Sequence, residues 1–427
     1  MFLILYYMKS KKTEKIFNEQ LQLIKPSEEM LRKINKTSDE FCRKINDNLI
    51  KNEIKADVFL GGSVAKGTLV HKNIYDIDVF VRFQGNKDEE ISDILGKILD
   101  KKFKKVHGSR DYFQNEIENI LIEVIPVLKI EKPGEAENVT DLSYFHVKYV
   151  LEKIKNDEKL KNEIILAKNF CYAQNVYGAE SYIKGFSGYA LELLICHYKT
   201  LLNLMQEISQ LKDNEKLIID DAHFYSSKEE LLKNLNFAKR QSPIILIDPT
   251  FKERNALSSL SKETFLRFKK ACKDFLNKPS RSFFVQKNIS DEFKKFKQVK
   301  IISVKTNKQV GDIAGTKSKK FYEFFLRQLK KEFRVKKNDF EYNEESNKAN
   351  FYFLLDKRND EIVKGPALEN KMNVEKFKKV HSNAFIKGDF VYAAIKHNVK
   401  FDEWFSNFKK KYKKIIKEMG ITYLRKK

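Results

Sequence analysis

The sequence predicts an α+β fold of several domains: a small sheet near the N-terminus, a mainly helical middle and an α/β C-terminal part. Apolar strands over 58–60 and 79–81 flank a glycine-rich turn and a loop. Apolar residues recur at helical spacing over 160–175 and 185–211. Strand and helix patterns then alternate over 300–355, and 427 residues are enough for about two to four domains.

Residues 12–50 are expected to form helices. Pro26 suits the start of the second helix, and Glu28 and Glu29 suit its first turn, where carboxylates face the positive end of the helix dipole. Apolar residues then recur at near-helical spacing, as expected for a helix that covers one face of a sheet.

A glycine-rich turn, GGS at 61–63, follows the first strand, and a D-x-D pattern opens the second strand. Because side chains alternate along a strand, Asp76 and Asp78 are expected on one face and Ile77 in a core. Two neighbouring carboxylates repel each other and lose hydration, and a hard cation such as magnesium relieves both costs. Backbone N–H groups at Gly62 and Ser63 suit phosphate, so the pair of motifs indicates nucleotide chemistry. Taken singly, D-x-D is a solvated strand end and GGS is a turn.

A helix is expected over 89–103 and a third strong strand over 120–130. Glu123 interrupts this strand. It is either an edge-strand carboxylate facing solvent or, beside the D-x-D strand, a third metal ligand. Two-metal phosphoryl transfer needs about three carboxylates around its cations.

The middle of the chain is predicted to be mainly helical. A loop around 133–134 leads to helical patterns over 160–175 and 185–211. A short strand over 243–249 and a further helix over 262–276 follow.

The chain resembles the class I (archaeal-type) CCA-adding enzymes, tRNA nucleotidyltransferases of the polymerase β-like superfamily. The resemblance covers roughly residues 12–285 and rests on the segments GGSVAKGT, YDIDVFVRF, IEVIPVLKI, YFHVKYVLEKIK, LAKNF, YGAESYIKGFSGYALELL and LIDPTFKERNALSSL. The last four are more specific than the superfamily motif.

The resemblance implies that Asp76, Asp78 and Glu123 bind magnesium and that Ser63 and Lys66 contact the triphosphate. The chain departs from the family in two places. Glu123 stands where close relatives usually have Asp, and the segment between Ser63 and Asp76 is about one residue longer than in typical members.

The resemblance also implies a nucleotide pocket lined by His146, Lys168 and Tyr177, with Arg254, beside Asn255, near the phosphates and the incoming base. These residue types suit the task, since Lys and Arg neutralise triphosphate charge and Tyr offers a stacking face. Without their neighbours, each would be an ordinary loop, surface or capping residue.

The C-terminal part is predicted to contain a strand over 300–306, a helix over 316–334, and strands over 340–342 and 349–355, a βαββ pattern like that of the family's body. Segments 361–368 and 385–394 resemble elements of its body and tail. A last helix is expected to carry one apolar stripe and to end at Gly420; the stripe comprises Phe405, Phe408, Tyr412, Ile415 and Met419.

Lys and Arg number 83 against 59 Asp and Glu, so the net charge is +24. This excess favours a polyanionic partner such as nucleic acid. The alternative explanation is low-GC coding, which gives chains rich in Lys, Asn, Ile and Phe. The basic runs 317–320, 330–331 and 409–414 could follow a tRNA backbone or form solvated helix faces.

No C-x-x-C pair occurs among the four cysteines, so neither a zinc site nor a disulfide framework is expected. The apolar start over 1–7 is too short to cross a bilayer and lacks the features of a signal peptide; Met8 is an alternative start. We therefore expect a cytoplasmic protein with no membrane partner.

Three domains are predicted: a nucleotidyltransferase catalytic domain over 1–145, a central substrate- and nucleotide-binding domain over 146–285, and an RNA-binding body and tail over 286–427. The resemblance implies a Mg²⁺-dependent enzyme that adds or repairs the CCA end of tRNA from CTP and ATP, with the tRNA acceptor end as partner. The oligomeric state, a homodimer included, is left open. The alternatives are another RNA nucleotidyltransferase that makes oligo(A) or poly(A), and a non-catalytic RNA-binding protein on the same fold.

Overall fold

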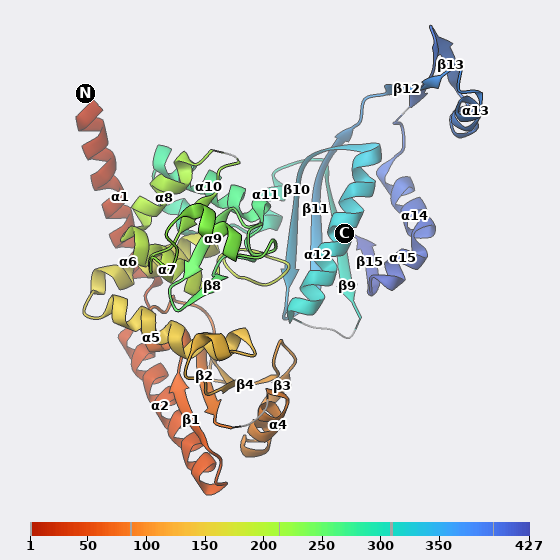
Figure 1. The fold of residues 1–427 in the computed structure, drawn as a ribbon. Coiled ribbons are helices and arrows are strands. Elements are labelled where there is room, and N and C mark those ends of the chain that lie inside the picture. The colour runs from red at the N-terminus through yellow and green to blue at the C-terminus, as the bar shows by residue number, and fades with distance from the viewer. Residues whose placement is uncertain (1, 86–87, 213, 308–310, 396) are drawn as a thin grey trace. The chain divides into compact units, whose positions relative to one another are not determined.

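The computed structural model describes residues 2–85, 88–212, 214–307, 311–395 and 397–427, with the side chains of residues 2–10, 88 and 89 left aside (Figure 1). The apolar start of the chain therefore lies outside the described side chains. The chain divides into two compact units. The first comprises Met1–Ala179 and Ile183–Gln286, and the second comprises Glu180–Tyr182 and Lys287–Lys427.

Two long helices open the first unit, α1 (Phe2–Ile24) and α2 (Glu28–Lys51). The predicted start of the second helix is confirmed. Ser27 is its N-cap, and its hydroxyl accepts a hydrogen bond from the backbone N–H of Met30 at 3.2 Å. Glu28 and Glu29 occupy the first turn.

A five-stranded sheet in the order β1-β2-β5-β4-β3 follows. Its strands are β1 (Ala56–Leu60), β2 (Tyr75–Phe83), β3 (Lys104–Val106), β4 (Tyr112–Ile117) and β5 (Ile120–Leu128). Strands β2 and β5 are parallel, and the other pairs are antiparallel. Since β5 is the central strand, the edge-strand interpretation of Glu123 is wrong.

The helix predicted over 89–103 is shorter, because α4 (Asp88–Ile98) ends before Asp100, whose carboxylate accepts a hydrogen bond from the N–H of Lys102 in the turn toward β3. Helices α2 and α4 pack with the sheet around one core. As the alternation predicted, Ile77, Val79 and Val81 of β2 are fully buried in it.

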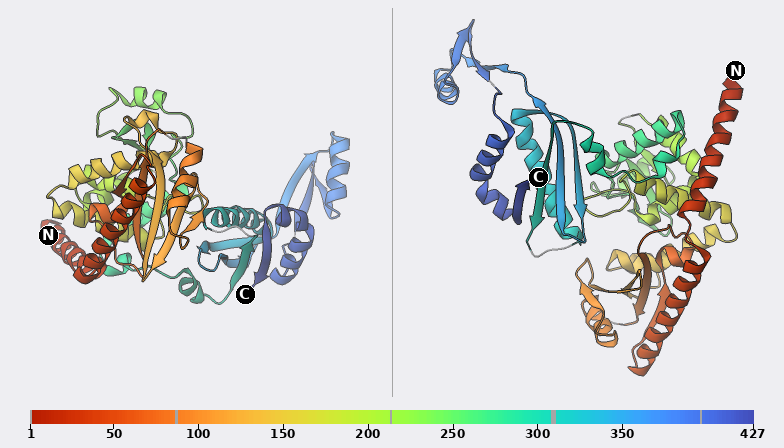
Figure 2. Two further views of the ribbon diagram at one scale, coloured as in Figure 1. Left: turned by 90° about the horizontal axis from the view of Figure 1, so that it is seen from below. Right: turned by 180° about the vertical axis from the view of Figure 1, so that it is seen from behind.

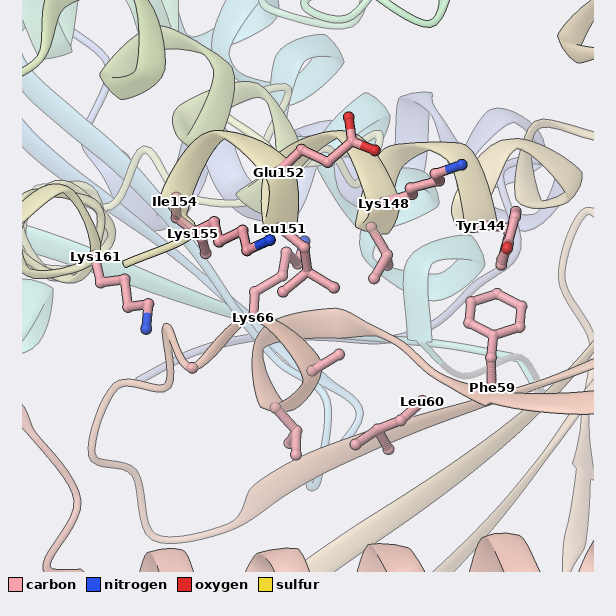
Figure 3. Close-up of a pocket in the computed structure, with 14 residues that line it drawn as sticks. Phe59, Leu60, Lys66, Tyr144, Lys148, Leu151, Glu152, Ile154, Lys155 and Lys161 are labelled. Carbon is pink, nitrogen blue, oxygen red and sulfur yellow. The ribbon is translucent and has the colours of Figure 1, made fainter. Parts of the chain in front are cut away.

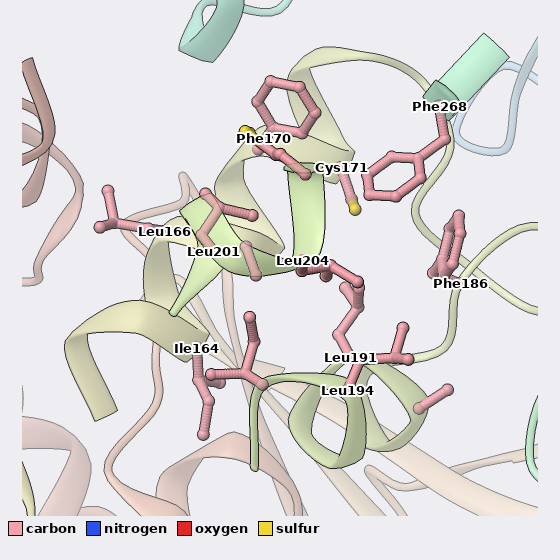
Figure 4. Packing of buried hydrophobic residues seen from close by; sticks show 14 of the residues in the cluster. Ile164, Leu166, Phe170, Cys171, Phe186, Leu191, Leu194, Leu201, Leu204 and Phe268 are labelled. Atoms are coloured by element: carbon pink, nitrogen blue, oxygen red, sulfur yellow. The ribbon is translucent and has the colours of Figure 1, made fainter. Parts of the chain in front are cut away.

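The rest of the first unit is mainly helical, as predicted. Its helices are α5 (Ser143–Ile154), α6 (Glu158–Ala173), α7 (Gly188–Tyr198), α8 (Leu201–Gln210), α9 (Lys228–Asn234) and α10 (Lys262–Asn277), with 3-10 turns η1 (Pro133–Glu135), η2 (Val139–Leu142) and η3 (Arg281–Phe284). A small sheet of β6 (Leu217–Ile219), β7 (Ile244–Asp248) and β8 (Phe251–Asn255) accompanies them. Figure 4 shows the tight packing of side chains from α6, α7, α8 and α10 in the largest core cluster.

The single helical pattern expected over 185–211 is two helices. Lys199 takes a left-handed conformation (φ +67°) that ends α7, and the hydroxyl of Thr200 caps α8 through the N–H of Asn203 at 3.1 Å.

The second unit confirms the predicted βαββ pattern. Its sheet has the antiparallel order β10-β11-β9-β15, and α12 packs against one face (Figures 1 and 2). These elements are α11 (Ile289–Lys294), β9 (Val299–Thr306), α12 (Gly311–Glu332), β10 (Phe333–Asn343), β11 (Lys348–Lys357) and β15 (Ile421–Lys426). A smaller lobe holds β12 (Glu361–Ala367), α13 (Lys371–Val380), β13 (Ala384–Lys387) and β14 (Phe390–Ile395).

The predicted last helix is interrupted at Tyr412, between α14 (Phe401–Lys411) and α15 (Lys413–Glu418). After this break the Ile415 side chain is 37% exposed, and Ile416 packs on the core instead. The chain then turns at Gly420 (φ +74°) into β15, a strand that the helical pattern did not predict.

One short stretch, Glu180–Tyr182, belongs to the second unit although its sequence neighbours belong to the first. The N–H of Ser181 donates to Asp312 at 2.9 Å, and the hydroxyl of Tyr182 donates to Glu344 at 3.1 Å. The ring of Tyr182 meets that of Tyr342 edge-on, with centroids 5.3 Å apart. Among the described helices, none is long and apolar enough to cross a membrane.

Candidate functional site

Three predicted carboxylates lie on one face of the five-stranded sheet. Asp76 and Asp78 alternate with buried residues along β2, as predicted. The parallel register pairs Asp78 with Glu123 of β5. The sheet therefore brings together acidic side chains that are 45 residues apart in the sequence.

The electrostatics of this face favour a cation. Burial, and then the charge of Asp76, raises the pKa of Asp78 to about 6. Burial, and then the charge of Asp78, raises the pKa of Glu123 to about 7. These hard oxygen donors suit magnesium. In the described part of the chain, however, no three His, Cys, Asp or Glu side chains are arranged to hold one ion together, so the three-ligand metal site stays a prediction.

Two other side chains hold these carboxylates. The amino group of Lys72 lies 3.0 Å from Asp76 Oδ2 and 5.2 Å from the centre of the Tyr172 ring. The side-chain amide of Gln114, on β4, donates to Glu123. Lys72 therefore supplies positive charge on the face where a cation is predicted.

The glycine-rich segment is more than the turn predicted for it. Gly61 is the N-cap of a short helix, α3 (Gly62–Lys66). Gly62 has φ +59°, and a Cβ atom there would lie 1.7 Å from Asp78 Oδ2. Only glycine fits this position, because α3 begins directly against the carboxylate.

A small cavity of about 30 Å³ brings together four of the predicted residues, Ser63, Asp76, Lys168 and Tyr177. Tyr172 stacks on Tyr177, with ring centroids 3.9 Å apart. The cavity is also lined by residues that the sequence did not single out, among them Thr68, Lys72 and Tyr172.

Lys66 and Lys168 share a buried partner. Glu192 of α7 lies 2.6 Å from the amino group of Lys66 and 2.9 Å from that of Lys168. Lys168 also donates to the hydroxyl of Thr68 at 2.8 Å. Glu192 was missed because one Glu in the apolar run YALELL carries no sequence signal of its contacts.

A second carboxylate, Asp248 at the end of β7, gathers His146 and Arg254. Its Oδ2 lies 2.9 Å from His146 Nε2 and 2.7 Å from Arg254 Nη1. The hydroxyl of Tyr189 donates to its Oδ1 at 2.9 Å, and the rings of His146 and Tyr189 stack 4.0 Å apart. Burial alone would raise the pKa of Asp248, but His146 and Arg254 hold it well below its usual range.

The side chain of Asn255 forms hydrogen bonds with backbone groups. Its Oδ1 accepts hydrogen bonds from the N–H groups of Leu246 and Leu257, and its Nδ2 donates to the carbonyl of Lys239. These bonds fix the β7–β8 turn, and the predicted contact of Asn255 with a nucleotide stays a prediction.

A larger cavity, of about 740 Å³, lies between β1, α3 and α5 (Figure 3). Figure 3 shows Phe59 and Tyr144 at one end and Lys155 and Lys161 toward the other. Lys66 also lines it, so Lys66 and Lys168 border different cavities although both bind Glu192.

Two protein families match successive parts of the chain. Residues 40–146 match the nucleotidyltransferase domain. Residues 162–285 match the second domain of tRNA nucleotidyltransferase. The first match contains the carboxylate face, and the second contains Lys168, Tyr177, Glu192 and Arg254.

Solved structures with a similar fold include a cytoplasmic RNA terminal U-transferase, with a TM-score of 0.50 and 15% identity over 65% of this chain and 99% of that one. Cid1 in complex with its short product ApU gives a TM-score of 0.51 and 14% identity, with the same coverage. At this identity the likeness concerns the fold alone, and it agrees with the predicted α+β class.

Curated relatives agree with the family matches. The CCA-adding enzyme of Nanoarchaeum equitans is 46% identical over 213 residues, which are 49% of this chain and 52% of that one. The CCA-adding enzyme of Methanocaldococcus jannaschii is 32% identical over 283 residues, 64% of this chain and 61% of that one. The match thus spans about half to three fifths of each relative. By these matches, the chain contains a nucleotidyltransferase domain followed by a region similar to the second domain of tRNA nucleotidyltransferase, and over the matched residues it is similar to archaeal CCA-adding enzymes.

Proposed function

We propose that this chain is an enzyme that adds or repairs the 3′-terminal CCA of tRNA, using CTP and ATP and releasing pyrophosphate. The observation that carries the proposal is the adjacency of two family matches in one chain. A nucleotidyltransferase domain over 40–146 is followed by the second domain of tRNA nucleotidyltransferase over 162–285. The predicted carboxylates lie in the first match, and the predicted nucleotide contacts are divided equally between the two.

In the proposed reaction the 3′-hydroxyl of the RNA gives up its proton to water and its oxygen forms a bond to the α-phosphorus of the nucleotide, while the bond from that phosphorus to pyrophosphate breaks. Asp76, Asp78 and Glu123 are the residues that would hold Mg²⁺. When bound, Mg²⁺ lowers the pKa of the attacking hydroxyl and neutralises charge on the leaving group. No protein nucleophile is needed.

The other predicted residues would bind and orient the nucleotide. Lys66, Lys168 and Arg254 carry the positive charge for its phosphates. Tyr177 offers a ring already stacked on Tyr172. His146 has a fixed orientation because Asp248 and the ring of Tyr189 hold it, which suits a residue that shapes a pocket.

Lys72 lines the small cavity beside the predicted nucleotide contacts. The small cavity of about 30 Å³ has room for about one water molecule, far less than a triphosphate needs. The amino group of Lys72 bonds Asp76 at one side of this cavity. We therefore propose that an arriving metal and nucleotide displace Lys72 from Asp76.

The test uses tRNA transcripts that lack the last three, two or one nucleotides, incubated with labelled CTP or ATP and magnesium. The proposal expects addition of two C residues and then one A. The doubly substituted Asp76→Ala, Asp78→Ala protein should lose all addition, and Asp47→Ala, an exposed carboxylate of α2, should keep it. Long A-tails without C would indicate another RNA nucleotidyltransferase. Tight tRNA binding with no incorporation would indicate a non-catalytic RNA-binding protein.

A cytoplasmic location fits the proposed substrate, and the C-terminal basic runs are the surfaces proposed to follow the RNA backbone. The division into three functional domains over 1–145, 146–285 and 286–427, and the possibility of a homodimer, stay predictions.

A further inference from the structure

Helix α7 buries a carboxylate among apolar side chains. Glu192 is 1% exposed and lies between Leu191 and Leu193, which are also buried. Removing a carboxylate from water is costly unless opposite charge and hydrogen bonds compensate it. The burial of Glu192 therefore depends on the charged groups that its carboxylate contacts.

Its partners are two lysines from two other elements. One oxygen, Oε2, lies 2.6 Å from Lys66 Nζ of α3, and the other, Oε1, lies 2.9 Å from Lys168 Nζ of α6. Both lysines are buried, at 7% and 4% exposure. Two buried ammonium groups that share one carboxylate form a cluster with a net charge of +1.

We infer that Glu192 is the positioning residue that holds Lys66 and Lys168 together, charged and aimed at the phosphates of the nucleotide. The inference rests on the proposed function, since that function makes both lysines phosphate ligands. Without Glu192, two ammonium groups would face each other in a medium of low dielectric constant, where like charges repel strongly. One of them would then turn away or lose its proton.

The N-terminal end of α7 is built to bring Glu192 close. The hydroxyl of Ser187 caps the helix through the N–H of Ala190. Gly188 lies one turn before Glu192, on the same face. A Cβ atom at Gly188 would lie 2.8 Å from the Tyr177 hydroxyl and 3.9 Å from Lys168 Cε. The missing side chain thus lets the helix approach both predicted nucleotide ligands.

The cluster leaves donors for a phosphate. An ammonium group has three N–H donors, and the described partner of Lys66 is Glu192, which takes one of them. Lys168 donates to Glu192 and to the hydroxyl and carbonyl oxygens of Thr68, so a phosphate at Lys168 would take the place of Thr68. Lys66 borders the larger cavity and Lys168 the smaller one.

The test compares CMP, CDP and CTP binding by calorimetry, with magnesium present, in the wild type, Glu192→Gln and Glu192→Asp. We expect Glu192→Gln to weaken CTP binding about tenfold or more, with a smaller loss for CDP and the smallest for CMP, because the lysines serve the phosphates. Glu192→Asp, which keeps the charge, should recover part of the affinity. The control is Glu163→Gln, another carboxylate of the helical part, which accepts a hydrogen bond from the N–H of Leu201.

Two results would overturn the inference: unchanged CTP affinity in Glu192→Gln, or equal losses for CMP and CTP, which would indicate a merely structural role. If Glu192→Gln does not fold, the double substitution Glu192→Gln, Lys168→Met removes one charge of each sign. The doubly substituted protein should fold and should bind CTP at least tenfold more weakly than the wild type. If it binds CTP with wild-type affinity, the inference is refuted as well. A wild-type protein that binds no CTP would refute the proposed function instead.

Discussion

Asp78 and Glu123 lie side by side on parallel strands, and the pKa of each is raised, that of Asp78 by burial and the charge of Asp76, and that of Glu123 by burial and the charge of Asp78. A carboxyl group whose folded pKa lies above its unfolded value binds more protons in the folded state. Folding stability then falls as the pH rises through that interval. In a metal-free protein this face is therefore a source of instability at neutral pH, which a bound cation would remove.

We expect Glu123→Gln to stabilise the metal-free protein at pH 8. The folded pKa of Glu123, about 7, exceeds the ordinary value of 4.5. The loss of folding stability that its ionisation causes is therefore complete above pH 7 and absent below pH 4.5. The amide should add about 3 kcal/mol to the free energy of unfolding at pH 8 and almost nothing at pH 4. Urea titrations with a chelator measure this. The control is Glu116→Gln, an exposed position of β4, and equal gains at both pH values would contradict the argument.

Gly62→Ala should destabilise the protein by about 2 kcal/mol or more, since the new Cβ would meet Asp78 and the positive φ is itself unfavourable. Gly67→Ala is the matched control. Gly67 also has a positive φ, of +64°, but its Cβ would have no neighbour within 4 Å. The excess loss at position 62, measured by chemical denaturation, isolates the contact with the carboxylate. Equal losses at both positions would show that the contact costs nothing.

At the residue level, the sequence pattern along one strand predicts the carboxylates, but not the side chains that contact the predicted site residues. The alternation of a strand is enough to place Asp76 and Asp78 on one face. The contact of Lys66 with Glu192 spans 126 residues and depends on how helices pack. No spacing in the sequence encodes such a contact, so Glu192, and similarly Lys72 and Tyr172, could not be singled out beforehand.

At the level of elements, the break between α7 and α8 depends on two residues. Thr200→Ala removes the hydroxyl that caps α8, so we expect a loss of about 1 kcal/mol in the free energy of unfolding. Thr200→Ser keeps the hydroxyl and should lose much less. Thermal or urea denaturation compares them, and equal losses for Ala and Ser would show that the cap contributes nothing.

Most elements of the chain were predictable because their apolar residues recur with a strong period. The helix breaks and the strand that were not predicted share a cause. Apolar residues continue at helical spacing across Lys199 and Tyr412, although the backbone turns at both. Strand β15 carries lysine and arginine at an edge of its sheet, so it lacks the apolar alternation that marks a strand. A periodicity contains neither the local caps and turns that reverse the backbone nor the tertiary contacts that form an edge strand.

At the level of the whole molecule, the chain divides into two compact units, and each has hydrophobic clusters of its own. We therefore expect two transitions in scanning calorimetry. Phe325→Ala, in the second unit, should lower only one of them, by about 3–5 kcal/mol of unfolding free energy. Phe268→Ala should lower the other, and a single transition shifted by both would contradict separate unfolding.

The charge of +24 has a consequence for the proposed partner. If lysines neutralise the phosphates of tRNA, counterions are released on binding, and affinity should fall steeply with salt. We expect at least about a tenfold loss in tRNA affinity between 50 and 200 mM salt. CTP binding, with few phosphates, should lose far less. A tRNA affinity that does not respond to salt would argue against binding through the backbone.

Glu180–Tyr182 has a consequence for the order in which the protein is made. Ser181 leaves the ribosome 131 positions ahead of its partner Asp312, and Tyr182 162 positions ahead of Glu344. Ser181 and Tyr182 therefore face water in place of these partners while the remainder of the first unit is synthesised. Their contacts close only once the second unit exists, so a nascent chain that stalls before residue 312 keeps this segment open to proteases that the finished protein would resist.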